Sequence, residues 1–88
     1  MWDIDIAKDR NGRVTVQITH MEEGPYARLS VNVETVSLKE REFVLNHDLN
    51  HPMFQGFLEE MISTGKFEDT GKTCNYGFVT NQPIWRIR

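Results

Sequence analysis

The sequence predicts an α+β fold, in which an antiparallel sheet of four to five strands has one helix packed on one face. Several short segments alternate apolar and polar residues, as half-buried strands do, and one segment repeats apolar residues at helical spacing. These segments follow the order hairpin, strand, strand, helix and closing strands. With 88 residues, 39% hydrophobic and 26% charged, the chain has the composition of a single folded domain spanning residues 1–88.

The alternation at residues 2–6 and 14–18 predicts a β-hairpin. A two-residue Asn11-Gly12 loop would place the apolar residues of the two strands on opposite faces. A three-residue loop over residues 10–12, with Gly12 in the left-handed conformation, places them on the same face. The register predicted in this way pairs Ile6 with Val16 and Ile4 with Ile18.

The clearest strand signal covers residues 27–33, after a turn signal at residues 20–25. Its apolar residues form the row expected to face the core, namely Ala27, Leu29, Val31 and Val33. Residues 37–42 are polar and indicate a connection, and residues 43–45 predict a short fourth strand.

One helix is predicted over residues 52–64. Its apolar face consists of Met53, Phe54, Phe57, Leu58, Met61 and Ile62. Asn50 or His51 is expected to cap the start, Pro52 suits the first turn, and Gly65 supplies a left-handed stop. Gly56 within the helix suggests a close approach to the sheet, and tolerated weakness is the alternative interpretation.

After the helix, glycine and asparagine punctuate residues 70–77, which indicates turns. Residues 77–80 and 84–87 then predict two short extended pieces, broken at residues 81–83, that are placed to close the sheet.

Charge and composition exclude several classes of protein. The net charge is −3 and the ten Lys and Arg residues are scattered along the chain, so we expect no direct binding to nucleic acid. Cys74 is the only cysteine, which excludes an intramolecular disulfide and a CxxC redox pair. Asp3 and Asp5 stand where a secretory signal has basic residues, and no apolar run is as long as a membrane span. These observations favour a cytoplasmic protein that does not associate with membranes.

Residues 24–33, Gly-Pro-Tyr-Ala-Arg-Leu-Ser-Val-Asn-Val, resemble the G-x-P-Y-A-x-L-T-V-N-L segment of a family of small uncharacterised proteins of bacterial phages and conjugative elements. The upstream Asn-Gly hairpin, the Asn-containing segment before the helix and the closing Thr70-Gly71 are also similar to that family, over residues 11–87. The sequence departs from the pattern at Leu45 and Leu49, where polar residues are expected. Small accessory proteins of such elements often counter host defences, including restriction and CRISPR systems. The resemblance therefore implies this context, and it implies no catalytic residues.

The residues with chemical potential support no enzyme. His47, Asp48 and His51 form H-D-x-x-H, and two histidines four residues apart on a helix can chelate a metal. However, Pro52 disfavours a helical conformation at His51, and the glutamate of the metalloprotease motif is absent, so we expect a capping and turn role. Cys74 has no oriented base near it in the sequence. We expect no catalytic residue, no metal site and no cofactor.

The predicted binding surface is the sheet face opposite the core-facing row, because one helix covers only one face of a sheet. Tyr26 is out of phase with the apolar row, which places it on that face. The residues expected there are Tyr26, Arg28, Ser30 and Asn32. Two loops are the alternatives: residues 46–51, with His47 and Asp48, and the acidic pair Glu22-Glu23.

Together these features predict a non-enzymatic protein-binding module of a mobile genetic element, an inhibitor of a host defence complex of the anti-CRISPR or anti-restriction type. A homodimeric structural or assembly protein is the alternative from a different class. A small metal-dependent enzyme that uses His47 and His51 is the third hypothesis.

Overall fold

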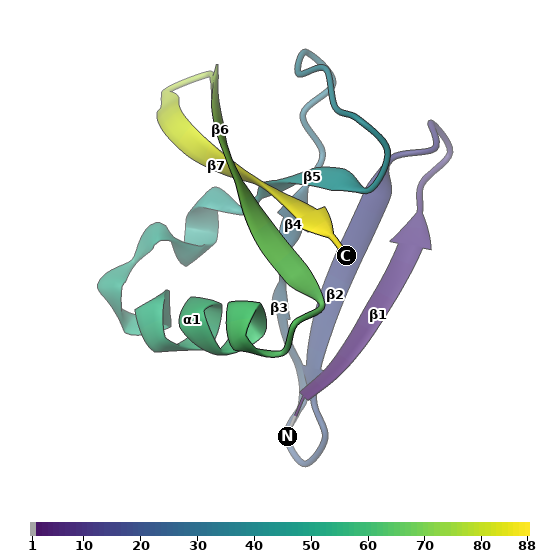
Figure 1. Cartoon of the computed structure of the whole chain (residues 1–88). Coiled ribbons are helices and arrows are strands. Elements are labelled where there is room, and N and C mark those ends of the chain that lie inside the picture. Colours follow the sequence, from purple (N-terminus) through teal and green to yellow (C-terminus); the bar gives the residue numbers. More distant parts are fainter. Residues whose placement is uncertain (1) are drawn as a thin grey trace.

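The computed structural model describes residues 2–88 and is shown in Figure 1. Its strands are β1 (Trp2–Lys8), β2 (Val14–His20), β3 (Gly24–Arg28), β4 (Ser30–Val31), β5 (Glu42–Leu45), β6 (Phe67–Tyr76) and β7 (Val79–Ile87). Two 3-10 turns, η1 (His47–Asn50) and η2 (Pro52–Phe54), lead into helix α1 (Gln55–Ser63). The α+β class is confirmed. None of the helices within residues 2–88 has the length and apolar character needed to cross a membrane.

The first hairpin has the predicted register. Ile6 lies opposite Val16 and Ile4 opposite Ile18. In the turn, the Gly12 N–H donates to the Asp9 carbonyl at 3.0 Å, and Gly12 has a φ of 77°, which confirms the three-residue loop. The Asp9 carboxylate also accepts from the N–H groups of Asn11 at 2.9 Å and Arg13 at 3.0 Å, so local hydrogen bonds hold this turn.

Strand β3 contains a bulge that changes the phase of its side chains. Ala27 pairs with Ile18 and Pro25 pairs with Thr19, so Tyr26 is an extra residue opposite β2. Its ring lies against Trp2, with centroids 4.8 Å apart, on the side of the sheet that faces the helix. The prediction that Tyr26 lies on the face opposite the core is therefore wrong, because a bulge breaks the strict alternation on which it depended.

The chain passes from one sheet to another at Leu29. Strands β1, β2 and β3 form a three-stranded sheet, whereas β4, β5, β7 and β6 form a four-stranded sheet in that order. The Leu29 N–H donates to the Val16 carbonyl at 2.8 Å, and its own carbonyl accepts from Asn46 N–H at 2.8 Å. The strands therefore divide into two antiparallel sheets instead of the single sheet of four to five strands that we expected. The alternation at residues 27–33 spans this transition without revealing it.

The second sheet contains a long hairpin that the sequence did not indicate. β6 and β7 run for ten and nine residues, and β7 continues through Pro83, where a break was predicted. Bulges between Asp69 and Thr73 and between Cys74 and Tyr76 absorb the irregular residues. The prediction of two short closing pieces is wrong because the strands continue through the bulges around Gly71 and Asn75, and of these residues only Gly77 lies in a turn.

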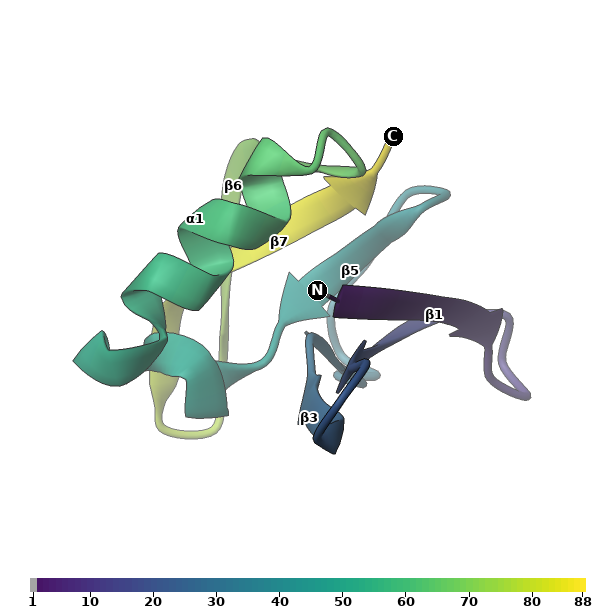
Figure 2. The same ribbon diagram turned by 90° about the horizontal axis from the view of Figure 1, so that it is seen from below.

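The helical segment covers residues 52–63, close to the predicted 52–64, but its first three residues form the 3-10 turn η2 and α1 begins at Gln55. Nδ1 of His51 accepts from the Met53 N–H at 3.2 Å, which caps the first turn, and Gly65 has a φ of 79° just past the end. A methyl group added at Gly56 would meet no atom within 4 Å, so the predicted close approach to the sheet is wrong. Figures 1 and 2 both show α1 alongside the start of β6.

Both sheets and the helix contribute to one hydrophobic core. Its buried residues are Val16, Ile18, Leu29, Phe43, Leu45, Leu49, Phe57, Met61, Phe67 and Trp85. Leu45 and Leu49, which depart from the family pattern, are each 3% exposed and therefore have a packing role. The shared core places the η1 turn next to the end of the β6–β7 hairpin, where the candidate site lies.

Candidate functional site

The four residues predicted to form one binding face do not lie on one surface. Tyr26 is 41% exposed but packs on Trp2 and on Phe57, with a centroid distance of 5.0 Å to the latter. Ser30 is 3% exposed, and its Oγ accepts from the Val16 N–H at 2.9 Å, so its place on an exposed face is wrong. Arg28 and Asn32 are exposed. The bulge in β3 and the change of sheet at Leu29 separate the four side chains.

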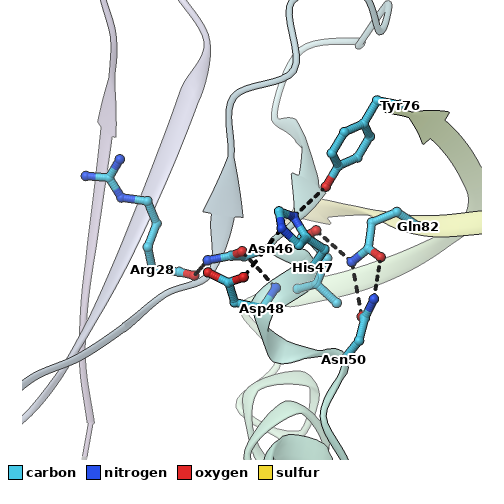
Figure 3. A network of polar contacts seen from close by, with 8 residues as sticks. Arg28, Asn46, His47, Asp48, Asn50, Tyr76 and Gln82 are labelled. Atoms are coloured by element: carbon cyan, nitrogen blue, oxygen red, sulfur yellow. Dashed lines mark hydrogen bonds and ion pairs between the residues drawn. The ribbon is translucent and has the colours of Figure 1, made fainter. Parts of the chain in front are cut away.

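The fold instead brings Arg28 next to the predicted loop at residues 46–51. Asn46 makes this connection, because its Nδ2 donates to the Arg28 carbonyl at 3.0 Å. Its Oδ1 accepts from the Asp48 N–H at 3.0 Å and caps the η1 turn. Figure 3 shows the two regions joined through this amide, with the Arg28 side chain directed away from the loop. Arg28 and the loop at residues 46–51, which are separate candidates in the sequence, are thus neighbours in the fold.

His47 extends this surface to the β6–β7 hairpin. Its Nδ1 lies 3.0 Å from the Tyr76 hydroxyl, and its Nε2 lies 3.4 Å from an Asp48 carboxylate oxygen (Figure 3). Burial raises the pKa of the Tyr76 phenol, and the nearby Cys74 and Asp48 raise it further, so the phenol keeps its proton at neutral pH. The Tyr76 hydroxyl and Nδ1 of His47 therefore share a hydrogen bond whose direction depends on the imidazole tautomer.

A hydrogen-bonded pair of amides, buried Gln82 and exposed Asn50, links the η1 turn to β7. Gln82 on β7 is 1% exposed, and its Nε2 donates to the Leu45 carbonyl at 2.7 Å. Its Oε1 accepts from Asn50 Nδ2 at 2.8 Å. Figure 3 shows this pair beside His47, between the η1 turn and β7. The turn and the hairpin are thus joined by hydrogen bonds at both His47 and Gln82, which limits their relative motion.

Phe78 is the most exposed large apolar side chain of the described residues. It occupies the two-residue turn between β6 and β7 with Gly77, and its side chain is fully solvated at 106% relative exposure. Gly77 has a φ of 54°, as the first central residue of a primed hairpin turn requires. In Figure 1 this turn projects at one end of the molecule. Its signal in the sequence is a Gly between two aromatic residues, and the prediction that these residues begin a strand is wrong at Gly77 and Phe78.

The histidines and the cysteine singled out from the sequence are His47, His51 and Cys74. His51 has an extended backbone, with a ψ of 138°, and its Nδ1 is occupied by the Met53 N–H, so it does not converge with His47. Within residues 2–88, no three His, Cys, Asp or Glu residues are placed to hold a metal ion. Burial raises the pKa of the Cys74 thiol, which disfavours the nucleophilic thiolate.

The acidic pair Glu22-Glu23 lies away from this surface. The two residues occupy the turn between β2 and β3, where their N–H groups donate to Nδ1 of His20 at 3.2 and 3.3 Å. In Figure 1 this turn is at the end of the molecule opposite the β6–β7 turn. The two predicted loops therefore cannot belong to one small interface.

Comparisons of the chain with protein-family models, with curated proteins and with solved structures find no match. Its function is therefore inferred from its own surface.

Proposed function

We propose that this protein is a non-enzymatic protein-binding module that contacts its partner through the loop–hairpin surface. This surface consists of Arg28, Asn46, His47, Asp48, Tyr76 and Phe78. The observation that carries the proposal is the complete exposure of Phe78 at the tip of a braced hairpin.

Phe78 has the properties of an interface anchor. An aromatic side chain of this size contributes most when it enters a desolvated pocket of a partner. No packing role within residues 2–88 accounts for its position, because its side chain is fully solvated. The turn that presents it is held through Tyr76 and Gln82, so little conformational freedom is lost on binding.

The residues around this anchor supply polar specificity. Asp48 is 78% exposed and His47 is 43% exposed, and Arg28 adds a guanidinium group on the other side of Asn46. Polar groups on the same surface as an exposed aromatic residue match the polar rim and the aromatic enrichment of protein interfaces. We propose that the partner is a host defence complex in the cytoplasm and that binding inhibits it. The resemblance of residues 24–33 to proteins of mobile elements supports this choice of partner.

The experiment adds purified protein to restriction endonuclease and CRISPR effector complexes and measures both target cleavage and binding. Wild type is expected to inhibit one complex stoichiometrically. Phe78→Ser should weaken binding at least tenfold, because the anchor contributes about 2 kcal/mol or more. Met21→Ser is the matched control, since Met21 is 65% exposed but lies in the turn at the opposite end.

Equal affinity of the Phe78→Ser variant and wild type for the inhibited complex would exclude the loop–hairpin surface. Failure of the protein to inhibit any complex would exclude the inhibitor role.

A homodimeric structural protein is the second candidate. The observation that favours it is the free edge of β1, which pairs only with β2 over seven residues without a bulge. Size-exclusion chromatography with light scattering distinguishes the two functions. A stable symmetric dimer without any host protein would favour the structural role.

A further inference from the structure

One end of the molecule concentrates positive charge that is dispersed in the sequence. Three adjoining hollows of about 380, 460 and 370 Å³ lie between the β1–β2 turn, the loop before β5 and the end of β7. Six of the ten Lys and Arg residues line them, but only two of the thirteen Asp and Glu residues do. We call this surface the basic face, and its cations are Lys8, Arg13, Lys39, Arg41, Arg86 and Arg88.

Most of this charge is not neutralised within the protein. Lys8, Arg13, Lys39 and Arg41 form no ion pair within residues 2–88. The Arg13 guanidinium instead donates to the backbone carbonyls of Glu34 and Val36, at 3.1 and 3.2 Å, which holds it in place without removing its charge. These four cations therefore attract anions in solution.

The two acidic residues of the basic face do not cancel this field. Glu42 is 4% exposed, and its carboxylate is compensated by Lys72 and by the Lys39 N–H. Only Glu40 presents an exposed carboxylate without an ion pair among the residues that line the basic face. The uncompensated charge of the basic face is therefore clearly positive.

A fourth hollow beside the basic face is lined by Asp69 and by Glu68, which pairs with Arg86 and Arg88. The acidic pair Glu22-Glu23, in contrast, lies far from the basic face. β2 is seven residues long, so its two ends are about 20 Å apart at roughly 3.3 Å per residue. The basic face borders the Val14 end, whereas Glu22 and Glu23 follow the His20 end. This separation exceeds the Debye length of about 8 Å at physiological salt, so the acidic end does not screen the basic face.

The chemistry of the basic face fits a phosphate backbone better than an acidic protein. Among the exposed large apolar residues, only Ile6 borders it, so it lacks the apolar anchors of a protein interface. No aromatic residue lines the three hollows, so bases of a single strand would find no stacking partner. In the sequence the cations are scattered, so we expected no direct binding to nucleic acid. Folding brings the cations together from four segments of the chain.

We propose that the basic face binds the phosphate backbone of double-stranded nucleic acid without sequence preference. This binding uses a surface other than the loop–hairpin surface and does not depend on the proposed inhibitor function. Lys8, Lys39 and Arg41 are exposed and unpaired within residues 2–88, whereas Nη1 of Arg13 is buried. Three cations that neutralise about three phosphates give a slope of roughly −2.7 for log K against log salt. Affinity should therefore fall about sixfold for each doubling of the salt concentration.

The test measures fluorescence anisotropy of a labelled 20-base-pair DNA duplex with the full chain, from 25 to 100 mM NaCl. We expect a Kd on the order of 10–100 µM at the lowest salt. Arg41→Glu should weaken binding at least tenfold and reduce the salt slope by about one, and Lys8→Glu should do the same. Arg28→Glu is the matched control, because it makes the same charge change at a residue that lines none of the three hollows, and it should change the affinity for the duplex less than twofold.

Circular dichroism of each variant establishes that it is folded before binding is compared. No saturable binding by wild type at 25 mM NaCl would overturn the proposal. An equal loss in Arg28→Glu and Arg41→Glu would also overturn it, because net charge alone would then explain the attraction. Tighter binding of polyglutamate than of a duplex with the same number of charges would assign the basic face to an acidic protein instead.

Discussion

The two hairpins of this protein are built in different ways. β1 and β2 pair over seven consecutive positions without a bulge, and their apolar residues share one face. β6 and β7 are longer, contain two bulges and consist mostly of polar residues. Both are closed by a turn with a positive-φ glycine, Gly12 in the first and Gly77 in the second.

The difference lies in what holds each hairpin in place. The first is specified by its own turn and alternation, and it joins the core through Val16 and Ile18. The second joins the core through Phe67 and Trp85, and polar groups hold its remaining residues in place. Gln82 binds the Leu45 carbonyl across 37 residues, and Thr70 Oγ1 donates to the Ile84 carbonyl across the bulge. A polar and bulged hairpin can therefore be held in place by buried hydrogen bonds in addition to its core residues.

Leu29→Ala should have the largest effect, because this residue is 0% exposed and lies where the two sheets meet. The cavity should lower the free energy of unfolding by about 2 to 5 kcal/mol, as measured by urea denaturation. Hydrogen exchange should show both hairpins losing protection together. Loss of protection in only one hairpin would mean that the two fold independently. The half-buried Leu38 is the control, and Leu38→Ala should cost about 1 kcal/mol or less.

A matched pair of glutamines compares the two hairpins directly. Gln82→Leu should cost roughly 2 to 3 kcal/mol, because it leaves the buried Leu45 carbonyl and the Asn50 amide without their partner. Gln17 also donates Nε2 to backbone carbonyls but is half-buried on the first hairpin. Gln17→Leu should therefore cost less than about 1 kcal/mol. Equal changes in the midpoint of thermal unfolding would contradict the distinction drawn between the hairpins.

The carboxyl group of Glu42, which pairs with Lys72 on the second hairpin, makes the stability of the folded state depend on pH. Burial raises the pKa of this carboxyl, but the Lys72 ammonium and the Lys39 N–H together outweigh burial and lower it below 4.5. The folded state thus binds this proton more weakly than the unfolded chain does. Its stabilisation is present above about pH 4.5 and is lost as the pH falls through the folded pKa.

Glu42→Gln should therefore reduce stability by about 1 to 2 kcal/mol at pH 7, and the difference from wild type should shrink in acid. Denaturant melts between pH 3 and 7 measure this dependence. Glu40→Gln, at an exposed neighbour, should leave the pH profile of stability unchanged. A constant difference between Glu42→Gln and wild type at all pH values would exclude the charge of Glu42 as the cause.

The smallest effects concern the turns. Gly12→Ala and Gly77→Ala should each cost about 1 kcal/mol, because alanine is strained at positive φ and meets no other atom within 4 Å at either site. Gly56→Ala, in the helix, should instead stabilise the protein by up to about 1 kcal/mol. Thermal melts of the three variants check the signs. A much larger loss of stability in Gly77→Ala than in Gly12→Ala would show that the two hairpins also differ in how strongly their turns require glycine.

Individual residues of the candidate site were predictable from the sequence, but their arrangement was not. Arg28, His47 and Asp48 were singled out from the sequence, and all three belong to the loop–hairpin surface. Their proximity was not predictable, because it depends on Asn46, whose amide reaches a carbonyl 18 residues away. Tyr26 and Ser30 were assigned to the wrong environment because alternation predicts faces only within an unbroken strand.

The sequence by itself determined the features that depend on near neighbours. These are the register of the first hairpin, set by the parity of a three-residue loop, and the bounds of the helix, set by His51 and Gly65. Only the tertiary structure decided the division into two sheets, the continuation of β7 through Pro83 and the gathering of six cations on one face. Turns and caps act over a few residues, whereas sheet pairing and charge clustering depend on which distant segments meet in the shared core.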